Sequence, residues 1–542
     1  MTTGTTDTLP IGPLQEGIWL FWRLNPASPA YSMPEVFHFD GDFDAGAAEF
    51  AFNETIRRHE ALRTTFHETE SGVVQVIDRD PDPVKIDLVD LRGLPAPLRD
   101  ERLDAAVTTA ANLPFDLAAG PPIRLTAIPV SGNRTTLVLV AHHIACDGTS
   151  MAILLHEFGE LYRSARRSSP PALEPAAPGY GALVRRQLAA LADGAFEEES
   201  AFWRERLAGA TGSVLPGTAP ATGGALDTCT VPTTLGDALA DAVTAYARGA
   251  GTTPFSVLLC AMQVMIAAAT ADGDVAVGTA TSGHTSKFSR TVGMLANAIV
   301  VRSRIDLRAS FAEVLEEVAL DLMDAIDHQD LPFSRMMADL HGAGHERGTE
   351  LMRTMFAAGA NGGLSLGEGR LFEQAPPIVE GPFELAVTCY IDHTGIAVDW
   401  EFALRAYTRE TARGYCAAYQ EILAMLLEQP DTAMDSLGLE EVLAHVVPAQ
   451  AGGAPSAVAV SPAVEPAGPL TPMEEAVAAV WCEVLDVPAV APHDDFFGLG
   501  GHSMLASQAV ALVRRTVSDT ASLRLLFDHP RLRDFCSRLE AR

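Results

Sequence analysis

A segment that lacks the composition of a folded core divides the chain into two unequal parts. Residues 446–470 contain five Pro, three Gly and a single charged residue, Glu465, in 25 positions. A stretch with so few bulky apolar residues cannot bury a core, so we expect a linker that is partly extended and partly flexible. The part before it, residues 1–445, is too long for one simple core, whereas the part after it, residues 471–542, suits a small helical bundle.

The larger part mixes helices and strands and has a minor break of its own. Residues 167–179, RSSPPALEPAAPG, contain four Pro. Both β-rich runs and helical patterns occur on each side of this break; the run at 135–141 precedes it, for example, and a helical pattern at 180–207 follows it. The pattern predicts an α+β fold of two similar lobes, at about 1–170 and about 180–445.

Composition disfavours several classes of function. The formal net charge is −32 and no stripe of Lys and Arg is present, which argues against nucleic-acid binding. The longest nearly apolar run, 257–271, has 15 residues and is too short for a membrane span, and the N-terminus lacks the features of a secretory signal. The seven Cys are scattered without a Cys-x-x-Cys pair, so we expect no disulfide framework, no structural metal site and a cytoplasmic location.

The clearest chemical motif follows the strand predicted at 135–141. It is HHIACDG, residues 142–148. Successive side chains of a strand face opposite ways, so one His should be structural and the other available to accept a proton or to hold a nucleophile. Asp147 and Gly148 suit a tight turn that folds the carboxylate back beneath the imidazole. The spacing alone leaves two other interpretations open: a core turn, or a metal site that includes Cys146.

Further motifs along residues 9–440 resemble, in order, those of the condensation domains of non-ribosomal peptide synthetases, which are relatives of chloramphenicol and CoA-dependent acyltransferases. The five matches besides HHIACDG are LPIGPLQEGIWLF (9–21), RRHEALRTTF (57–66), LPFDLAAGPPIRL (113–125), VGMLANAIVVR (292–302) and HQDLPFS (328–334). The agreement in order makes a coincidental core turn the poorer interpretation. The resemblance implies an α+β condensation domain of two chloramphenicol-acetyltransferase-like lobes.

The same resemblance implies a role for each residue of the site. His143 would face a substrate tunnel and either take the proton of an acceptor amine or position that amine. His142, the other histidine of the motif, is also expected among the catalytic residues. Asp147 would form a structural ion pair with Arg302. Gly148 would let a backbone N–H group approach the reacting carbonyl as an oxyanion donor. No metal is expected.

Residues 471–542 carry a second motif, centred on a serine. An amphipathic helix opens the segment, and Gly500 and Gly501 precede Ser503, which is expected to start the next helix. Its hydroxyl would lie beside backbone N–H groups that favour a phosphate, although a lone serine at such a position is usually an N-cap. The string DDFFGLGGHSMLASQAV (494–510) resembles the attachment site of peptidyl carrier proteins. This resemblance implies an all-α four-helix bundle and 4′-phosphopantetheine attached covalently to Ser503.

The two resemblances together imply a condensation–carrier didomain of antibiotic or other natural-product biosynthesis. It would form an amide between an acyl or peptidyl thioester on an upstream donor carrier protein and an amine tethered to Ser503. A phosphopantetheinyl transferase would modify the serine. No adenylation or thioesterase motif is found in the sequence. We therefore expect a free-standing adenylation domain to load Ser503 in trans, and a downstream synthetase domain or thioesterase to take the product.

Three alternatives keep the same motifs. The first is an ester-forming or epimerising member of the same superfamily. The second is a non-catalytic platform that recruits modifying enzymes to the carrier-bound substrate, which would survive the loss of His143. The third is an acyltransferase that uses free acyl-CoA, which would survive the loss of Ser503.

Overall fold

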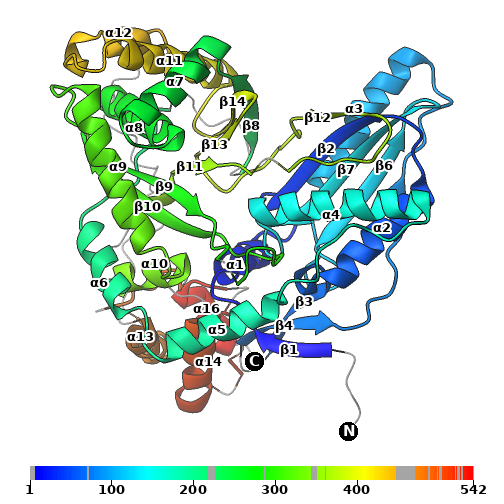
Figure 1. The fold of residues 1–542 in the computed structure, drawn as a ribbon. Coiled ribbons are helices and arrows are strands. Elements are labelled where there is room, and N and C mark those ends of the chain that lie inside the picture. Colours follow the sequence, from blue (N-terminus) through cyan, green and yellow to red (C-terminus); the bar gives the residue numbers. More distant parts are fainter. Residues whose placement is uncertain are drawn as a thin grey trace.

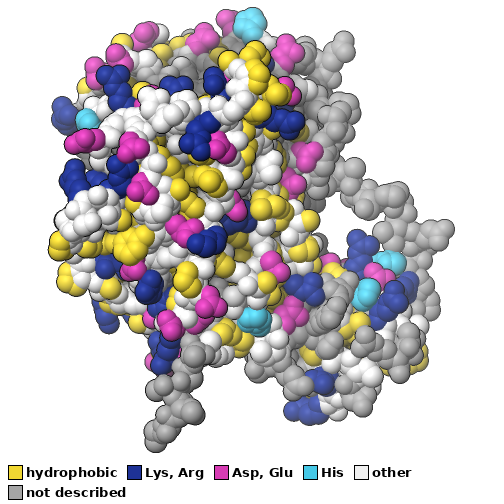
Figure 2. All heavy atoms as spheres, turned by 90° about the vertical axis from the view of Figure 1, so that its right-hand side faces the viewer, with side chains coloured by type: hydrophobic (Ala, Val, Ile, Leu, Met, Phe, Trp, Pro, Cys, Tyr) yellow, Lys and Arg dark blue, Asp and Glu magenta, His cyan; other side chains and the backbone are white. Residues whose placement is uncertain are grey.

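The computed structural model describes residues 6–540 except for 70–71, 218–225, 286, 343–350, 361, 447–469, 486, 488, 497–498, 500–502, 519, 522–524 and 527–528. The predicted linker, 446–470, thus lies almost entirely outside the described residues. On the face shown in Figure 2, basic and acidic side chains are interspersed and form no continuous basic stripe.

The first lobe is built on a five-stranded sheet of order β12-β2-β7-β6-β5, next to a three-stranded sheet of order β1-β4-β3 (Figure 1). Its strands are β1 (Thr6–Pro10), β2 (Ser32–Asp40), β3 (Thr64–Thr69), β4 (Gly72–Asp78), β5 (Asp87–Leu88), β6 (Ile123–Pro129) and β7 (Arg134–His142). Its helices are α1 (Glu16–Leu24), α2 (Ala45–Arg58), α3 (Ala96–Asn112) and α4 (Gly148–Arg167).

Strand β7 lies inside this sheet, and its sequence explains the layering of the lobe. Leu137 and Leu139 pack with α2 and α4 in one apolar cluster, whereas Val138 and Val140 belong to the cluster on the opposite face, which includes residues of α3. An apolar run without polar alternation is what a strand buried on both faces requires. The strand therefore ends, at His142, in the interior of the molecule.

The second lobe has a six-stranded sheet of order β10-β9-β11-β13-β14-β8. Its strands are β8 (Thr228–Thr234), β9 (Asp274–Thr281), β10 (Asn297–Arg304), β11 (Thr354–Ala358), β13 (Leu385–Asp392) and β14 (Gly395–Ala403). The helices that follow the first lobe are α5 (Tyr180–Ala192), α6 (Glu197–Arg206), α7 (Asp237–Gly249), α8 (Pro254–Thr270), α9 (Phe311–Asp327), α10 (Phe333–Gly342), α11 (Arg409–Glu428) and α12 (Leu439–Ala444).

Helix α8 is the centre of this second core, because all of its residues from Ser256 to Ala267 are buried. In the part of the chain that the structure describes, no single helix is both long enough and apolar enough to cross a bilayer. Helices α7 and α8, which are bent relative to each other, reach that length and apolarity only when they are taken together. The helix predicted at 180–207 is in fact two helices, α5 and α6. Gly194, between them, has a φ of +68°, a backbone conformation that glycine adopts readily.

One strand of the C-terminal half belongs to the sheet of the first lobe. β12 (Arg370–Gln374) pairs antiparallel with β2, with Arg370 opposite Asp40 and Gln374 opposite Val36. Figure 1 shows β12 beside β2, far along the chain from the other strands of that sheet. The two lobes are therefore joined by a shared sheet as well as by the chain between them.

The C-terminal unit contains the helices α13 (Pro472–Leu485), α14 (Ser503–Thr516) and α16 (Leu532–Glu540). Trp481 is buried, with its ring centroid 5.0 Å from that of Phe496 and 6.0 Å from that of Phe535. Thr471 and Glu474 form a capping box, since each side chain accepts the backbone N–H group of the other. This unit therefore has an aromatic core of its own.

Candidate functional site

The end of β7 delivers the HHIACDG turn to the junction of the lobes. The backbone N–H of His143 donates to the carbonyl of Tyr31 at 2.8 Å, which fixes the chain just beyond the strand. Asp147 then serves as the N-cap of α4, because its Oδ1 accepts the N–H of Ser150 at 2.8 Å. A strand end and a helix start thus hold the turn on both sides.

His142 points into the core. Its side chain lies edge-on against the ring of Phe115, with the centroids 5.7 Å apart, and its Nδ1 accepts the N–H of Ile144 at 3.1 Å. Burial, helped by the charges of His143 and Arg124, lowers the pKa of His142 to about 3. The imidazole is therefore neutral and braces the turn. The catalytic role predicted for His142 finds no support in this geometry.

His143 has the geometry of a base. Its Nδ1 lies 3.2 Å from the sulfur of Met294, and because a thioether has no proton to give, this contact is compatible with a ring that carries its proton on Nδ1. In that tautomer the other ring nitrogen, Nε2, keeps its lone pair when the ring is neutral. Burial lowers the pKa of His143, and the charge of Asp147 only partly opposes this. The ring is thus a hydrogen-bond acceptor near pH 7.

The carboxylate of Asp147 bridges the two lobes. Besides the N–H of Ser150, it accepts the backbone N–H groups of Leu295 and Ala296, each at 2.9 Å, and lies 3.1 Å from Nε2 of His284. Burial alone would raise the pKa of Asp147, but the hydrogen bonds and charge of His284 and the bonds from Ser150 hold it below its usual value. The buried carboxylate is therefore ionised and fully satisfied.

The predicted ion pair between Asp147 and Arg302 is wrong. Arg302 binds Asp274 through two contacts of 2.8 and 2.6 Å, next to it on the antiparallel pair β9 and β10. Asp147 touches the chain at Ala296, and the six residues from there to Arg302 span roughly 20 Å of strand. His284, just beyond the end of β9, takes the place that the sequence assigned to Arg302.

Gly148 is the first residue of α4. A Cβ atom built there would lie 3.8 Å from Cβ of Ala360, an ordinary contact, so the space around it does not demand glycine. Its place at the helix start does put backbone N–H groups of the first turn beside the motif, where they favour negative charge. The structure thus keeps the predicted oxyanion role open without requiring a glycine for it.

Residues outside the motif hold the turn in place. Gln15 donates from Nε2 to the carbonyl of Ile144 at 2.8 Å, and Tyr180 donates to the carbonyl of Met294 at 2.9 Å. Replacement of Gly293 by any other residue would cause a steric clash, because a Cβ atom there would lie 2.1 Å from the ring of Tyr180. Gln15 and Gly293 fall in motifs singled out from the sequence, at 9–21 and 292–302, and their roles were not foreseen.

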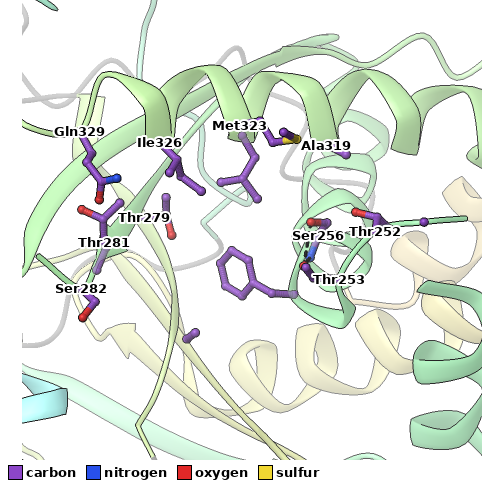
Figure 3. Close-up of a pocket in the computed structure, with 15 residues that line it drawn as sticks. Thr252, Thr253, Ser256, Thr279, Thr281, Ser282, Ala319, Met323, Ile326 and Gln329 are labelled. Carbon is purple, nitrogen blue, oxygen red and sulfur yellow. Dashed lines mark hydrogen bonds between the residues drawn. The ribbon is translucent and has the colours of Figure 1, made fainter. Parts of the chain in front are cut away.

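A pocket of about 500 Å³ opens in the second lobe, between residues of α8, β9 and α9 (Figure 3). One of its lining residues, Ser282, lies two positions before His284, which binds Asp147; another, Thr281, donates to the carbonyl of Asn297, next to Ala296, whose N–H group binds the same carboxylate. Two residues of extended chain cover roughly 7 Å. One end of the pocket therefore lies close to the residues that bind Asp147.

Ser503 is the first residue of α14, as the sequence predicted for its backbone. A helix start is a suitable place for a phosphodiester, because its N–H groups are free to bind one. The position therefore fits a phosphopantetheine group. Among the described residues no group of three or more His, Cys, Asp or Glu side chains could hold a metal ion.

Comparisons with known proteins account for nearly the whole chain. Residues 5–441 match the condensation domain, and residues 475–539 match the phosphopantetheine attachment site. Chondramide synthase cmdD of Chondromyces crocatus is 34% identical over 62% of this chain, and phosphinothricin tripeptide synthetase PhsB of Streptomyces viridochromogenes is 28% identical over 81% of it. The chain spans only 9% and 38% of the length of these two relatives.

The fold has counterparts among solved structures. The first condensation domain of the calcium-dependent antibiotic synthetase, in complex with a substrate analogue, superposes with a TM-score of 0.68 at 19% identity. The superposition covers 79% of this chain and 99% of that domain. At this level of identity the likeness shows the fold alone.

Proposed function

Because the chain belongs to the condensation-domain family of non-ribosomal peptide synthetases and includes a phosphopantetheine attachment domain, we propose that it joins two specific carrier-bound substrates. One is an acyl or peptidyl thioester presented by an upstream donor carrier protein. The other is an amine tethered to Ser503. The lengthened chain, now joined by an amide, remains on Ser503.

The observation that carries this proposal is the placement of His143, which is held just beyond the end of β7 by Tyr31 and has its Nδ1 3.2 Å from the sulfur of Met294. Burial lowers the pKa of His143, so the ring is neutral near pH 7, and a proton on Nδ1, beside Met294, would leave the lone pair of Nε2 for the substrate. A neutral imidazole in this state can accept a hydrogen bond or a proton from an attacking amine. Asp147 is too heavily engaged to do this itself, and we assign it to holding the lobes around His143.

The reaction needs no redox partner. The amine nitrogen attacks the thioester carbonyl, a C–N bond forms and the C–S bond breaks. The proton that the amine loses passes to Nε2 of His143 and then to the departing thiolate, so that atoms and charge balance. The N–H groups at the start of α4, from Gly148 onward, are suited to stabilise the negative charge that develops on the carbonyl oxygen.

Ser503 is proposed to hold the acceptor through phosphopantetheine, which supplies a flexible arm and a thioester. Tethering both substrates lets positioning contribute much of the rate, and effective molarities of ~10⁵–10⁸ M are known for well-oriented groups. We further propose that a phosphopantetheinyl transferase modifies Ser503, that a free-standing adenylation domain loads it in trans, and that a downstream synthetase domain or thioesterase takes the product.

We propose a reducing, cytoplasmic setting for this reaction. The seven cysteines are scattered along the sequence without a Cys-x-x-Cys pair, which supports that setting. The two family matches support natural-product biosynthesis as the wider context.

The test loads Ser503 directly, so that no unidentified partner is needed. A broad phosphopantetheinyl transferase and an aminoacyl-coenzyme A place the amine on the arm, an acyl N-acetylcysteamine thioester serves as donor, and mass spectrometry of the tail peptide reads the transfer. We expect the acyl mass on Ser503, and a loss of about 100-fold or more in rate for His143→Ala. His156→Ala, an exposed histidine on α4, is the matched control.

Other outcomes separate the alternatives. Unchanged transfer by His143→Ala would favour the non-catalytic platform, and transfer to a free amine by Ser503→Ala would favour a carrier-independent acyltransferase. A product that mild alkali cleaves after its release from the arm would be an ester.

A further inference from the structure

The pocket of the second lobe is lined without a single charge. None of the 15 residues around it is Asp, Glu, Lys, Arg or His. Leu322, Met323 and Ile326 of α9 and Phe255 of α8 contribute apolar surface. Such a lining, with a volume of about 500 Å³, is typical of a site for a small organic group.

One hydroxyl in the pocket lacks a partner. Thr279 is only 2% exposed, and its Oγ1 has no hydrogen bond within the described part of the chain. The neighbouring hydroxyls are engaged: Thr253 pairs with Ser256 at 2.9 Å, and Thr281 donates to the carbonyl of Asn297 at 3.4 Å. A buried hydroxyl without a partner is unfavourable, and Oγ1 has almost no accessible surface in this rotamer, so rotation of the Thr279 side chain toward the pocket would let a ligand satisfy it.

The pocket has an open side and an inner end. Met323 and Ile326 are 61% and 37% exposed, and Figure 3 shows them on α9, which borders the pocket, with Thr279, Thr281 and Gln329 grouped to one side of them. The inner end is marked by Ser282, two residues before the His284 that binds Asp147. The inner end of the pocket thus lies next to the segment that binds Asp147.

We propose that the pocket binds the acyl side chain of a thioester substrate, and that this side chain is uncharged, apolar over most of its length and carries one hydrogen-bonding atom that reaches Thr279. The inference rests on the function proposed above. An ammonium or carboxylate group would lose its hydration here and find no opposite charge among the lining residues, so the pocket selects against both.

Binding of non-reactive thioether probes tests the proposal independently of turnover. The probes are S-hexyl, S-(5-oxohexyl), S-(6-aminohexyl) and S-(5-carboxypentyl) N-acetylcysteamine, titrated calorimetrically into the full chain. We expect the two charged probes to bind at least about tenfold more weakly than S-hexyl. Thr279→Val should weaken the oxohexyl probe about fivefold and leave S-hexyl unchanged.

A second experiment fills the pocket with a larger side chain. Ala319→Phe places a ring on the lining of α9 and should abolish binding of the neutral probes, whereas Leu320→Phe, next to it but outside the lining, should not. Equal affinity for charged and neutral probes, or unchanged binding by Ala319→Phe, would overturn the proposal. Since Thr279→Val is nearly isosteric, it remains informative if Ala319→Phe fails to fold.

The two proposals fail in different ways. If the probes behave as expected but His143→Ala transfers acyl groups normally, the pocket stands and the proposed function falls. If His143 is required but the pocket variants change neither binding nor the choice of acyl group, the function stands and the pocket assignment falls. Attaching the same side chains to the amine on Ser503 tells which of the two thioesters the pocket serves.

Discussion

At the scale of single residues, one carboxylate links the first lobe to the second. Asp147 caps α4 in the first lobe and accepts hydrogen bonds from His284, Leu295 and Ala296 in the second. Met294, adjacent to these residues, supports the ring of His143 through its sulfur. The position of His143 therefore depends on Asp147, although no hydrogen bond between the two side chains is found among the described residues.

Removal of that carboxylate should destabilise the protein. Asp147→Ala leaves three backbone N–H groups and His284 without their acceptor, and we expect a loss of about 3 kcal/mol in the free energy of unfolding, measured by urea denaturation. Asp90→Ala, which breaks an exposed pair with Arg92, is the control and should change stability little. Equal effects of the two substitutions would contradict the bridging role.

The partner of Asp147 can be checked by comparing two basic residues. His284→Ala should lower the rate of acyl transfer about tenfold, because Asp147 and the loop at Met294 lose an anchor. Arg302→Ala should leave that rate nearly unchanged, because its pair with Asp274 lies at the far end of β10. A larger effect from Arg302 would restore the ion pair that the sequence suggested.

The sequence foresees part of this residue-scale picture. HHIACDG locates His143 and Asp147 because a strand, a turn and a helix start leave few ways to arrange seven consecutive residues. The contact with His284 joins positions 137 residues apart, and no local pattern encodes it. Which basic residue faces the carboxylate is decided by how the lobes pack.

At the scale of elements, three strands bring carboxylates together. Glu35 of β2 lies close enough to Glu373 of β12 and Asp399 of β14 to feel their charges. Burial, and then these two charges, raise the pKa of Glu35 to about 8. The folded protein therefore holds a proton there that the unfolded chain, with an ordinary glutamate, has already released at neutral pH.

The consequence is a pH-dependent stability. Because the folded pKa of Glu35 is raised, its protonation favours the folded state at low pH, and that benefit is lost as the pH rises toward about 8. Glu35→Gln should match the wild type near pH 5 and melt at a higher temperature near pH 8.5, as read by thermal denaturation. Glu101→Gln, on the exposed side of α3, should show no such trend. A constant difference at both pH values would contradict the prediction.

Elements with strong local patterns are predicted well. The apolar run at 135–141 becomes β7, and the start of a helix at Ser503 is found in α14. The single helix predicted at 180–207 is wrong, because its break depends on the backbone conformation at Gly194 rather than on a change in periodicity. β12 was not foreseen, since a five-residue edge strand carries little pattern of its own.

At the scale of the whole molecule, the fold class and the two family assignments made from the motifs are confirmed. The motifs succeed because they lie at the site and at the attachment serine, where chemistry restricts the residues. The pairing of β12 with β2 and the bridge at Asp147 both join the halves of the large domain, and both arise only in the assembled structure.

The shared sheet should be needed for the lobes to work together. Prolines at both Leu371 and Phe372 remove two adjacent N–H groups, and in an antiparallel pair one of these faces β2. We expect the double variant to exchange amide hydrogens faster at residues 36–40 of β2, as measured by mass spectrometry, and to transfer acyl groups more slowly. Unchanged exchange in β2 would contradict a structural role for β12.

The crossing strand also affects how such proteins can be recombined. The proline-rich break at 167–179 looks like the natural place to join the front half of one synthetase to the back half of another. In a hybrid joined at this break, residues 370–374 come from the parent of the back half. They would have to pair with a β2 strand from the other parent. Hybrids that keep β2 and β12 from the same parent should therefore inherit an intact sheet, whichever parent provides the chain between them.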